Sequence, residues 1–136
     1  QMDRLDNFIA TRKANFKYLK GRLSSCEEFI YLPQAAPDSD PSWFGFPITL
    51  KESSPVSRLD LTAYLDQKKI GTRLLFAGNL TRQPCMEKVH FRISGTLENT
   101  DYVMENTFWV GVQPALSHEM LDFTAKNIEA YLGVSF

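Results

Sequence analysis

Four hydrogen-bonding side chains gather in one short stretch near the middle of the chain. Arg73, Asn79, Arg82 and Gln83 all lie within residues 71–84, at the end of a strand-like run. A guanidinium holds phosphate oxygens through two parallel charge-assisted hydrogen bonds, whereas side-chain amides bind hydroxyl or carbonyl groups directionally. This combination predicts a binding site for an anionic ligand such as a phosphorylated sugar.

The same residues have a structural interpretation as well. Arg73 can pair with an acidic neighbour, and Asn79 can hold a turn by bonding its own backbone. The ligand interpretation gains an aromatic flank from Ser42, Trp43 and Phe44. Both interpretations remain open at the level of the sequence.

Other kinds of active site lack the residue spacing that they need. His90 and His118 have no second histidine or cysteine at metal-ligand spacing. Cys26 and Cys85 lie too far apart for a CxxC metal knuckle, and two cysteines make no disulfide framework. The chain also has no Gly-x-Ser-x-Gly elbow and no glycine-rich phosphate loop. We therefore expect no metal site and no nucleophilic triad in these residues.

Composition narrows the function classes further. The 136 residues are 43% hydrophobic, which is typical of a globular domain, and 15 basic residues face 16 acidic ones. No broad basic surface is available for a nucleic-acid backbone, so we expect no nucleic-acid binding. No apolar run approaches the length of a membrane span, and the amino terminus does not resemble a signal peptide. We therefore expect a soluble, cytoplasmic protein without membrane insertion.

The first element is an amphipathic helix over residues 3–23. Apolar residues recur at helical spacing from Leu5 to Leu23, and basic residues occupy most of the other faces. The helix begins within three residues of the terminus without a hydrophobic staple. We interpret this start as a cut through a longer chain.

A sheet is expected within residues 28–136. Aromatic and β-branched runs predict strands at residues 28–32, 43–50, 72–76 and 107–112. Pro47 lacks a backbone N–H, which confines the second strand to a sheet edge or a bulge.

Serine caps and glycine stops define the other helices. Ser57 begins one helix that Gly71 ends, Ser117 begins another that Gly133 ends, and a single helical turn is expected at residues 101–105. The order of elements predicts an α+β fold, a small mixed or antiparallel sheet with helices on one face. One core over residues 1–136 is the simplest organisation.

Several motifs, spread along the chain, resemble a known family. They are Ile70-Gly71-Thr72, Gln83-Pro84, Asn99-Thr100-Asp101, Phe108-Trp109-Val110-Gly111-Val112-Gln113-Pro114 and Leu116-Ser117. Together they resemble the carboxy-terminal domain of the DegT/DnrJ/EryC1/StrS sugar aminotransferase superfamily, whose members have fold type I and use pyridoxal or pyridoxamine phosphate. Typical members carry a His-Tyr pair and a Pro-Leu-His segment before the Gln-Pro motif. This chain has Leu75-Phe76 and Gly78-Asn79-Leu80-Thr81-Arg82 there instead.

That departure indicates one branch of the superfamily. Residues 43–49, 71–80 and 107–111 look like the CDP-4-dehydro-6-deoxyglucose 3-dehydratase family of lipopolysaccharide O-antigen dideoxysugar synthesis. Members of that family use pyridoxamine phosphate and, in the best-known case, a [2Fe-2S] cluster. They remove the C3 hydroxyl of a CDP-linked 4-keto-6-deoxy sugar, and an iron-sulfur/flavin reductase partner supplies electrons.

The resemblance also implies a division of labour. The cofactor-binding residues, the catalytic histidine and the cluster cysteines would belong to a larger preceding domain, joined through the helix at residues 3–23. This chain would bind no cofactor or metal, would hold no catalytic residue, and would be inactive alone. Its role would be to close over the sugar nucleotide and to help form a homodimer. Its substrate-binding residues would be Arg73, Phe76 as an apolar wall, Asn79, Arg82 and Gln83.

Two other functions remain open. The parent protein could be an aminotransferase, which an upstream Schiff-base lysine would support and an upstream histidine would oppose. The chain could also be a self-contained module that binds a sugar nucleotide without any partner domain.

Overall fold

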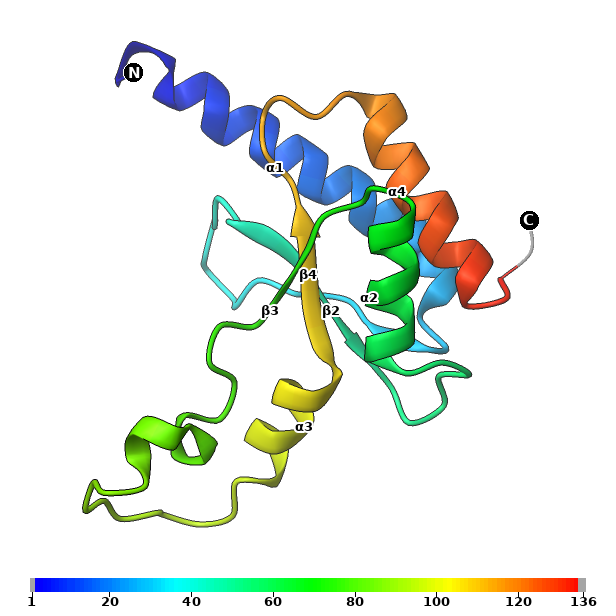
Figure 1. The fold of residues 1–136 in the computed structure, drawn as a ribbon. Coiled ribbons are helices and arrows are strands. Elements are labelled where there is room, and N and C mark those ends of the chain that lie inside the picture. Colours follow the sequence, from blue (N-terminus) through cyan, green and yellow to red (C-terminus); the bar gives the residue numbers. More distant parts are fainter. Residues whose placement is uncertain (1, 135–136) are drawn as a thin grey trace.

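The computed structural model describes residues 2–134, which surround a small twisted sheet (Figure 1). Within these residues the sheet has four strands in the order β1-β2-β4-β3, and each neighbouring pair is antiparallel. The strands are β1 (Ile30–Tyr31), β2 (Gly45–Leu50), β3 (Thr72–Leu74) and β4 (Thr107–Gly111). Of the two predicted sheet types, the antiparallel one is therefore present.

Helices supply most of the remaining regular structure. They are α1 (Leu5–Arg22), α2 (Arg58–Gln67), α3 (Glu98–Asn106) and α4 (His118–Tyr131). Short 3-10 turns occur at Met2–Arg4, Leu23–Cys26, Leu80–Arg82 and Pro84–Met86. Ser57 and Ser117 cap α2 and α4 as predicted, because their hydroxyls accept the backbone N–H of Asp60 and Met120.

The core lies between one face of the sheet and α1, α2 and α4. Alternate residues of β2 and β4 point into it, with Phe46 opposite Val110 and Ile48 opposite Phe108. The helices contribute buried apolar side chains to the same cluster, namely Phe16, Leu19, Leu61, Leu65, Leu121, Ala125 and Ile128. This arrangement confirms the predicted α+β fold with helices packed on one face.

Several boundaries differ from the prediction, including those of α1, predicted at residues 3–23, and the end of β4, predicted at residue 112. Strand β1 has two residues rather than five, β2 begins at Gly45 rather than at residue 43, and β3 ends at Leu74 because Phe76 adopts a φ of 46°. The single turn expected at residues 101–105 is a nine-residue helix, α3. Strand β2 as a whole lies inside the sheet, but β1 pairs only with its last two residues. Pro47 therefore has a strand neighbour only on the β4 side, and on its other side no strand requires the N–H that proline lacks.

The end of α2 is formed by Lys69 and not by Gly71 as predicted. The N–H of Ile70 bonds the Leu65 carbonyl (2.9 Å), and the N–H of Lys69 bonds the Asp66 carbonyl (2.8 Å). These two bonds make a Schellman motif, in which the residue after the cap takes a left-handed conformation. Lys69 does so, with a φ of 63°.

Replacing Lys69 with glycine is expected to raise the free energy of unfolding by about 0.5–1 kcal/mol. A left-handed conformation is unfavourable for a residue with a Cβ, and the greater flexibility of unfolded glycine offsets only part of that gain. The neighbouring change Lys68→Gly is the matched control, because Lys68 has a φ of −81°. Urea unfolding should show Lys69→Gly stabilised and Lys68→Gly destabilised. Equal destabilisation of both variants would contradict the strain at Lys69.

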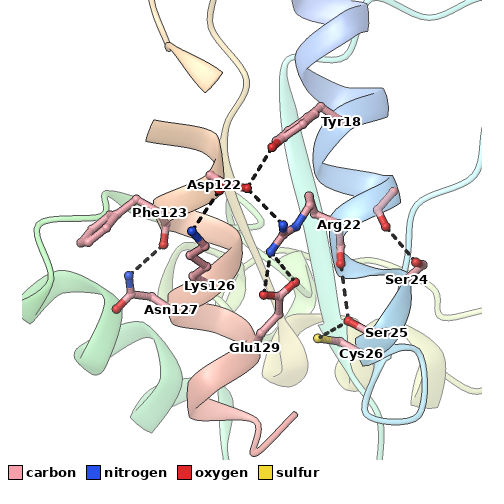
Figure 2. Close-up of polar contacts among 11 residues, drawn as sticks. Tyr18, Arg22, Ser24, Ser25, Cys26, Asp122, Phe123, Lys126, Asn127 and Glu129 are labelled. Atoms are coloured by element: carbon pink, nitrogen blue, oxygen red, sulfur yellow. Dashed lines mark hydrogen bonds and ion pairs between the residues drawn. The ribbon is translucent and has the colours of Figure 1, made fainter. Parts of the chain in front are cut away.

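A polar network joins α1 to α4, and we call it the α1–α4 seam (Figure 2). Arg22 pairs with the buried carboxylate of Glu129 (Nη2 to Oε2, 3.1 Å) and with Asp122 (Nη1 to Oδ1, 3.3 Å). Asp122 also accepts from the Tyr18 hydroxyl (2.8 Å) and pairs with Lys126 (3.1 Å). The Tyr18 hydrogen bond first, and the Lys126 contact second, lower the pKa of Asp122.

Candidate functional site

The chain turns sharply after β3, and the loop that follows packs against α3. Phe76 and Gly78 both have positive φ, at 46° and 63°. A Cβ at position 78 would lie 2.2 Å from Cγ of Met104 on α3, so the loop can approach the helix this closely only with glycine there. The turn places the polar residues that follow it beside the first turn of α3.

Three of these polar groups converge in what we call the Asp101 cluster, formed by Asp101, Arg82 and Asn79. Arg82 donates through Nε to Oδ1 of Asp101 (2.6 Å) and through Nη2 to Oδ2 (2.5 Å). Asn79 donates its amide N–H to Oδ1 of the same carboxylate (2.7 Å). Its own Oδ1 accepts from the backbone N–H (3.1 Å) and the hydroxyl (2.7 Å) of Thr81. Asn79 is only 2% exposed, so its side chain is buried between Asp101 and Thr81.

The cluster is electrostatically biased toward an ionised carboxylate. The hydrogen bond from Arg82, followed by the one from Asn79, lowers the pKa of Asp101 to about 2. The same contact with Asp101 raises the pKa of Arg82. The ion pair is therefore complete at neutral pH and fixes one edge of the guanidinium.

The other predicted site residues lie around this cluster. Gln83 is half-buried and donates from Nε2 to the Ala77 carbonyl (2.7 Å), which closes the loop. Arg73 is exposed on β3 opposite Trp109, and its Nη1 donates to the carbonyl of Thr72 (3.0 Å). Phe76 is 81% exposed at the loop tip. The structure thus joins the side chains of Asn79 and Arg82 through Asp101, while Arg73 and Phe76 remain open to solvent near the end of β3.

The structural interpretation of these residues is partly realised. Asn79 holds the turn, as that interpretation expected, but the arginine that pairs with an acidic residue is Arg82 rather than Arg73. Sequence reasoning did not identify Asp101 as the partner, although it lies in one of the quoted motifs. Nineteen residues separate it from Arg82, so no local periodicity links the two.

The aromatic flank is divided between the core and the surface. Trp43 stacks on Phe16 of α1 (4.8 Å between ring centroids) and so belongs to the core side. Phe44 is 67% exposed and packs against Trp109 (4.9 Å). Trp109 packs closely against Gly45, where a Cβ would lie 2.3 Å from the indole, and its Nε1 donates to the Leu74 carbonyl. Trp109 is thus an aromatic neighbour that the sequence did not single out.

The pKa of Asp101 gives a testable pH dependence. Because its folded value of about 2 lies below its ordinary value of 3.8, the ion pair stabilises the fold above about pH 4 and this contribution is lost as pH falls toward 2. Carbon-13 NMR of the carboxyl group should show a midpoint near pH 2. In Arg82→Gln the midpoint should move up toward 3.8. An unshifted midpoint in the unmodified protein would contradict the pairing.

The carboxylate of the Asp101 cluster is already engaged by its neighbours. Both oxygens of Asp101 are engaged by Arg82 and Asn79, so the cluster has no carboxylate left for a pyridine nitrogen. Between residues 2 and 134, no group of three or more His, Cys, Asp or Glu side chains is placed to hold a metal ion. Cys26 is buried, which raises the pKa of its thiol, and Cys85 is exposed; both are free.

No helix within residues 2–134 is both long enough and apolar enough to cross a bilayer.

Several known proteins are similar in sequence to this chain. Over its whole length the chain is 54% identical to the lipopolysaccharide biosynthesis protein RfbH of Salmonella typhimurium, covering 31% of that protein. It is 41% identical over 135 residues to the dTDP-4-dehydro-2,6-dideoxy-D-glucose 3-dehydratase of Saccharopolyspora spinosa, covering 29% of it. The chain therefore spans about a third of the length of these relatives.

A solved structure shares the fold. The E. coli GDP-4-keto-6-deoxy-D-mannose-3-dehydratase with bound hydrated PLP superimposes with a TM-score of 0.84 at 23% identity, over 94% of this chain and 32% of that one. The small sheet with its covering helices is thus a lobe found within a pyridoxal phosphate enzyme. The sequence model of the DegT/DnrJ/EryC1/StrS aminotransferase family matches residues 1–129. The chain therefore belongs to the DegT/DnrJ/EryC1/StrS aminotransferase family.

Proposed function

We propose that this chain is the carboxy-terminal lobe of a pyridoxamine-phosphate-dependent nucleotide-sugar 3-dehydratase. The parent enzyme removes the C3 hydroxyl from a CDP-linked 4-keto-6-deoxy sugar in cytoplasmic O-antigen dideoxysugar synthesis. The observation that carries this proposal is the 54% identity to RfbH along the entire chain, together with the 41% identity to a protein named as a 3-dehydratase.

In this proposal the lobe contributes substrate contacts and closure. The Asp101 pair uses Nε and Nη2 of Arg82, which leaves Nη1 as a donor for a phosphate oxygen. Arg73 is a second exposed guanidinium, and Phe76 supplies an apolar wall. Asn79 and Gln83 act by fixing the loop, since both bond within it. Closure of the lobe excludes water from the reacting sugar.

The chemistry itself belongs to the rest of the parent. Pyridoxamine phosphate, when bound there, supplies the amine that activates the sugar ketone, and a [2Fe-2S] cluster with a reductase partner supplies electrons. The parent is a homodimer in this proposal. The 136-residue lobe alone is inactive in this proposal, because it spans only about a third of the length of its relatives.

Turnover by the full-length protein tests the proposal directly. With pyridoxamine phosphate, a reductase and the CDP-linked 4-keto sugar, the expected product has lost its C3 oxygen. A product that has instead gained an amino group would establish transamination and reject dehydration. The chain belongs to a family that is named for aminotransferases, and this supports transamination as the second candidate function.

Arg73→Ala and Arg82→Ala in the full-length enzyme should each raise KM for the nucleotide sugar by about tenfold or more. Each change removes a charged hydrogen bond to phosphate. Asp101→Asn is the matched control for Arg82, because it breaks the ion pair but keeps the guanidinium. An unchanged KM in both arginine variants would reject these substrate contacts. Tight binding of CDP-sugar by the 136-residue chain alone, measured by calorimetry, would favour the self-contained module.

A further inference from the structure

One segment carries the sequence pattern of a strand but forms none. Three apolar residues alternate with three basic ones in the order Lys88-Val89-His90-Phe91-Arg92-Ile93. Such alternation is typical of a half-buried strand. Yet this segment has no regular structure, and Val89, Phe91 and Ile93 are 48%, 46% and 52% exposed. It lies in the yellow-green excursion at the lower left of Figure 1, away from the sheet.

From residue 90 onward the backbone of this segment is unpaired as well. In the described part of the chain, residues 90–96 form no backbone hydrogen bond. The bonds that bracket them are Val89 N to Met86 O (3.0 Å) and Asp101 N to Leu97 O (2.8 Å). A run of free N–H and C=O groups beside exposed apolar side chains is the condition of a strand edge that lacks its partner.

The basic face is also without a partner. No ion pair joins Lys88, His90 or Arg92 to another residue within 2–134. Antiparallel pairing with the same segment of a second copy would place both sets of basic side chains on one face, where like charges repel. The charge pattern therefore favours a partner strand that carries carboxylates.

We propose that residues 88–93 form an added edge strand in the full-length protein, paired with a strand edge whose outer face carries carboxylates. We assign that edge to the part of the protein outside these 136 residues, because RfbH is about three times as long as this chain. The inference rests on the proposed function, in which the chain is one lobe of a longer enzyme. Backbone hydrogen bonds supply the pairing, the apolar face packs inward, and Lys88 and Arg92 meet the carboxylates.

Hydrogen exchange of the full-length protein tests this strand. Alternate amides within residues 89–93 should exchange at least about tenfold more slowly than an unprotected peptide, because every second N–H of an edge strand bonds its neighbour. Exchange of all these amides at the unprotected rate would overturn the proposal. Protection that disappears on dilution would also overturn it, since the partner edge would then belong to another copy.

Two variants separate the contributions of the apolar face and the basic face. Phe91→Asp should abolish the protection, and Arg92→Glu should reduce it by placing a carboxylate against carboxylates. Ser94→Ala, just beyond the alternating run, is the control and should leave the protection unchanged. Full protection in Arg92→Glu would overturn the inference that the partner strand carries carboxylates.

A crosslinker at position 91 identifies the partner strand. A photoreactive phenylalanine analogue there should link to a peptide from outside residues 1–136, and a link only to residues within 1–136 would overturn the assignment. These readouts are independent of turnover. Protection in a full-length protein without dehydratase activity would support the strand and reject the proposed function.

Discussion

Replacing Arg22 with alanine is expected to lower the free energy of unfolding by about 3–5 kcal/mol. Glu129 is 1% exposed, and Arg22 supplies its ion pair across the α1–α4 seam. Removing the guanidinium leaves a buried carboxylate without a counter-charge, which costs far more than the loss of an exposed pair. A domain of this size has only about 5–15 kcal/mol of stability in total, so urea unfolding should show a large shift.

Two further variants decide whether burial of the charge is the cause. The double change Arg22→Met with Glu129→Leu removes both charges and should recover most of the lost stability. Lys126→Ala removes a cation from the exposed part of the same seam, where Lys126 is 64% exposed, and should have a far smaller effect. If the double variant were as unstable as Arg22→Ala, lost packing rather than the unpaired carboxylate would explain the result.

The change Phe108→Ala is expected to lower the free energy of unfolding by about 3–5 kcal/mol. Phe108 is fully buried in β4, opposite Ile48 on one side and Leu74 on the other. Truncation removes its burial and leaves a cavity that the two neighbouring strands close only in part. Thermal or urea unfolding of the variant measures the loss directly.

Phe76→Ala is the matched control, because the same side chain is lost from a position that is 81% exposed. Its free energy of unfolding should stay within about 0.5 kcal/mol of the unmodified protein. In the full-length enzyme the ranking should reverse, with Phe76→Ala raising KM while the protein remains folded. Equal destabilisation by the two changes would contradict the described core.

Local sequence signals predicted the regular elements well. Ser57 and Ser117 begin their helices and Gly133 follows the last one because each signal acts over three or four residues. The end of α2 was assigned wrongly because glycine is the usual left-handed residue, and here Lys69 takes that conformation within a motif anchored by buried Leu65 and Ile70. The family resemblance depended on motifs along the chain and was confirmed by the match over residues 1–129.

The sequence by itself therefore determined helices α1, α2 and α4, the serine caps of α2 and α4, the α+β class and the family, because these follow from contacts between near neighbours and from motif order. Only the tertiary structure decided the partner of Arg82, the close packing of Trp109 against Gly45 and the ion pair between Arg22 and Glu129. Each joins residues at least 19 positions apart, so its geometry exists only after the sheet and helices have packed and their intervening loops have closed.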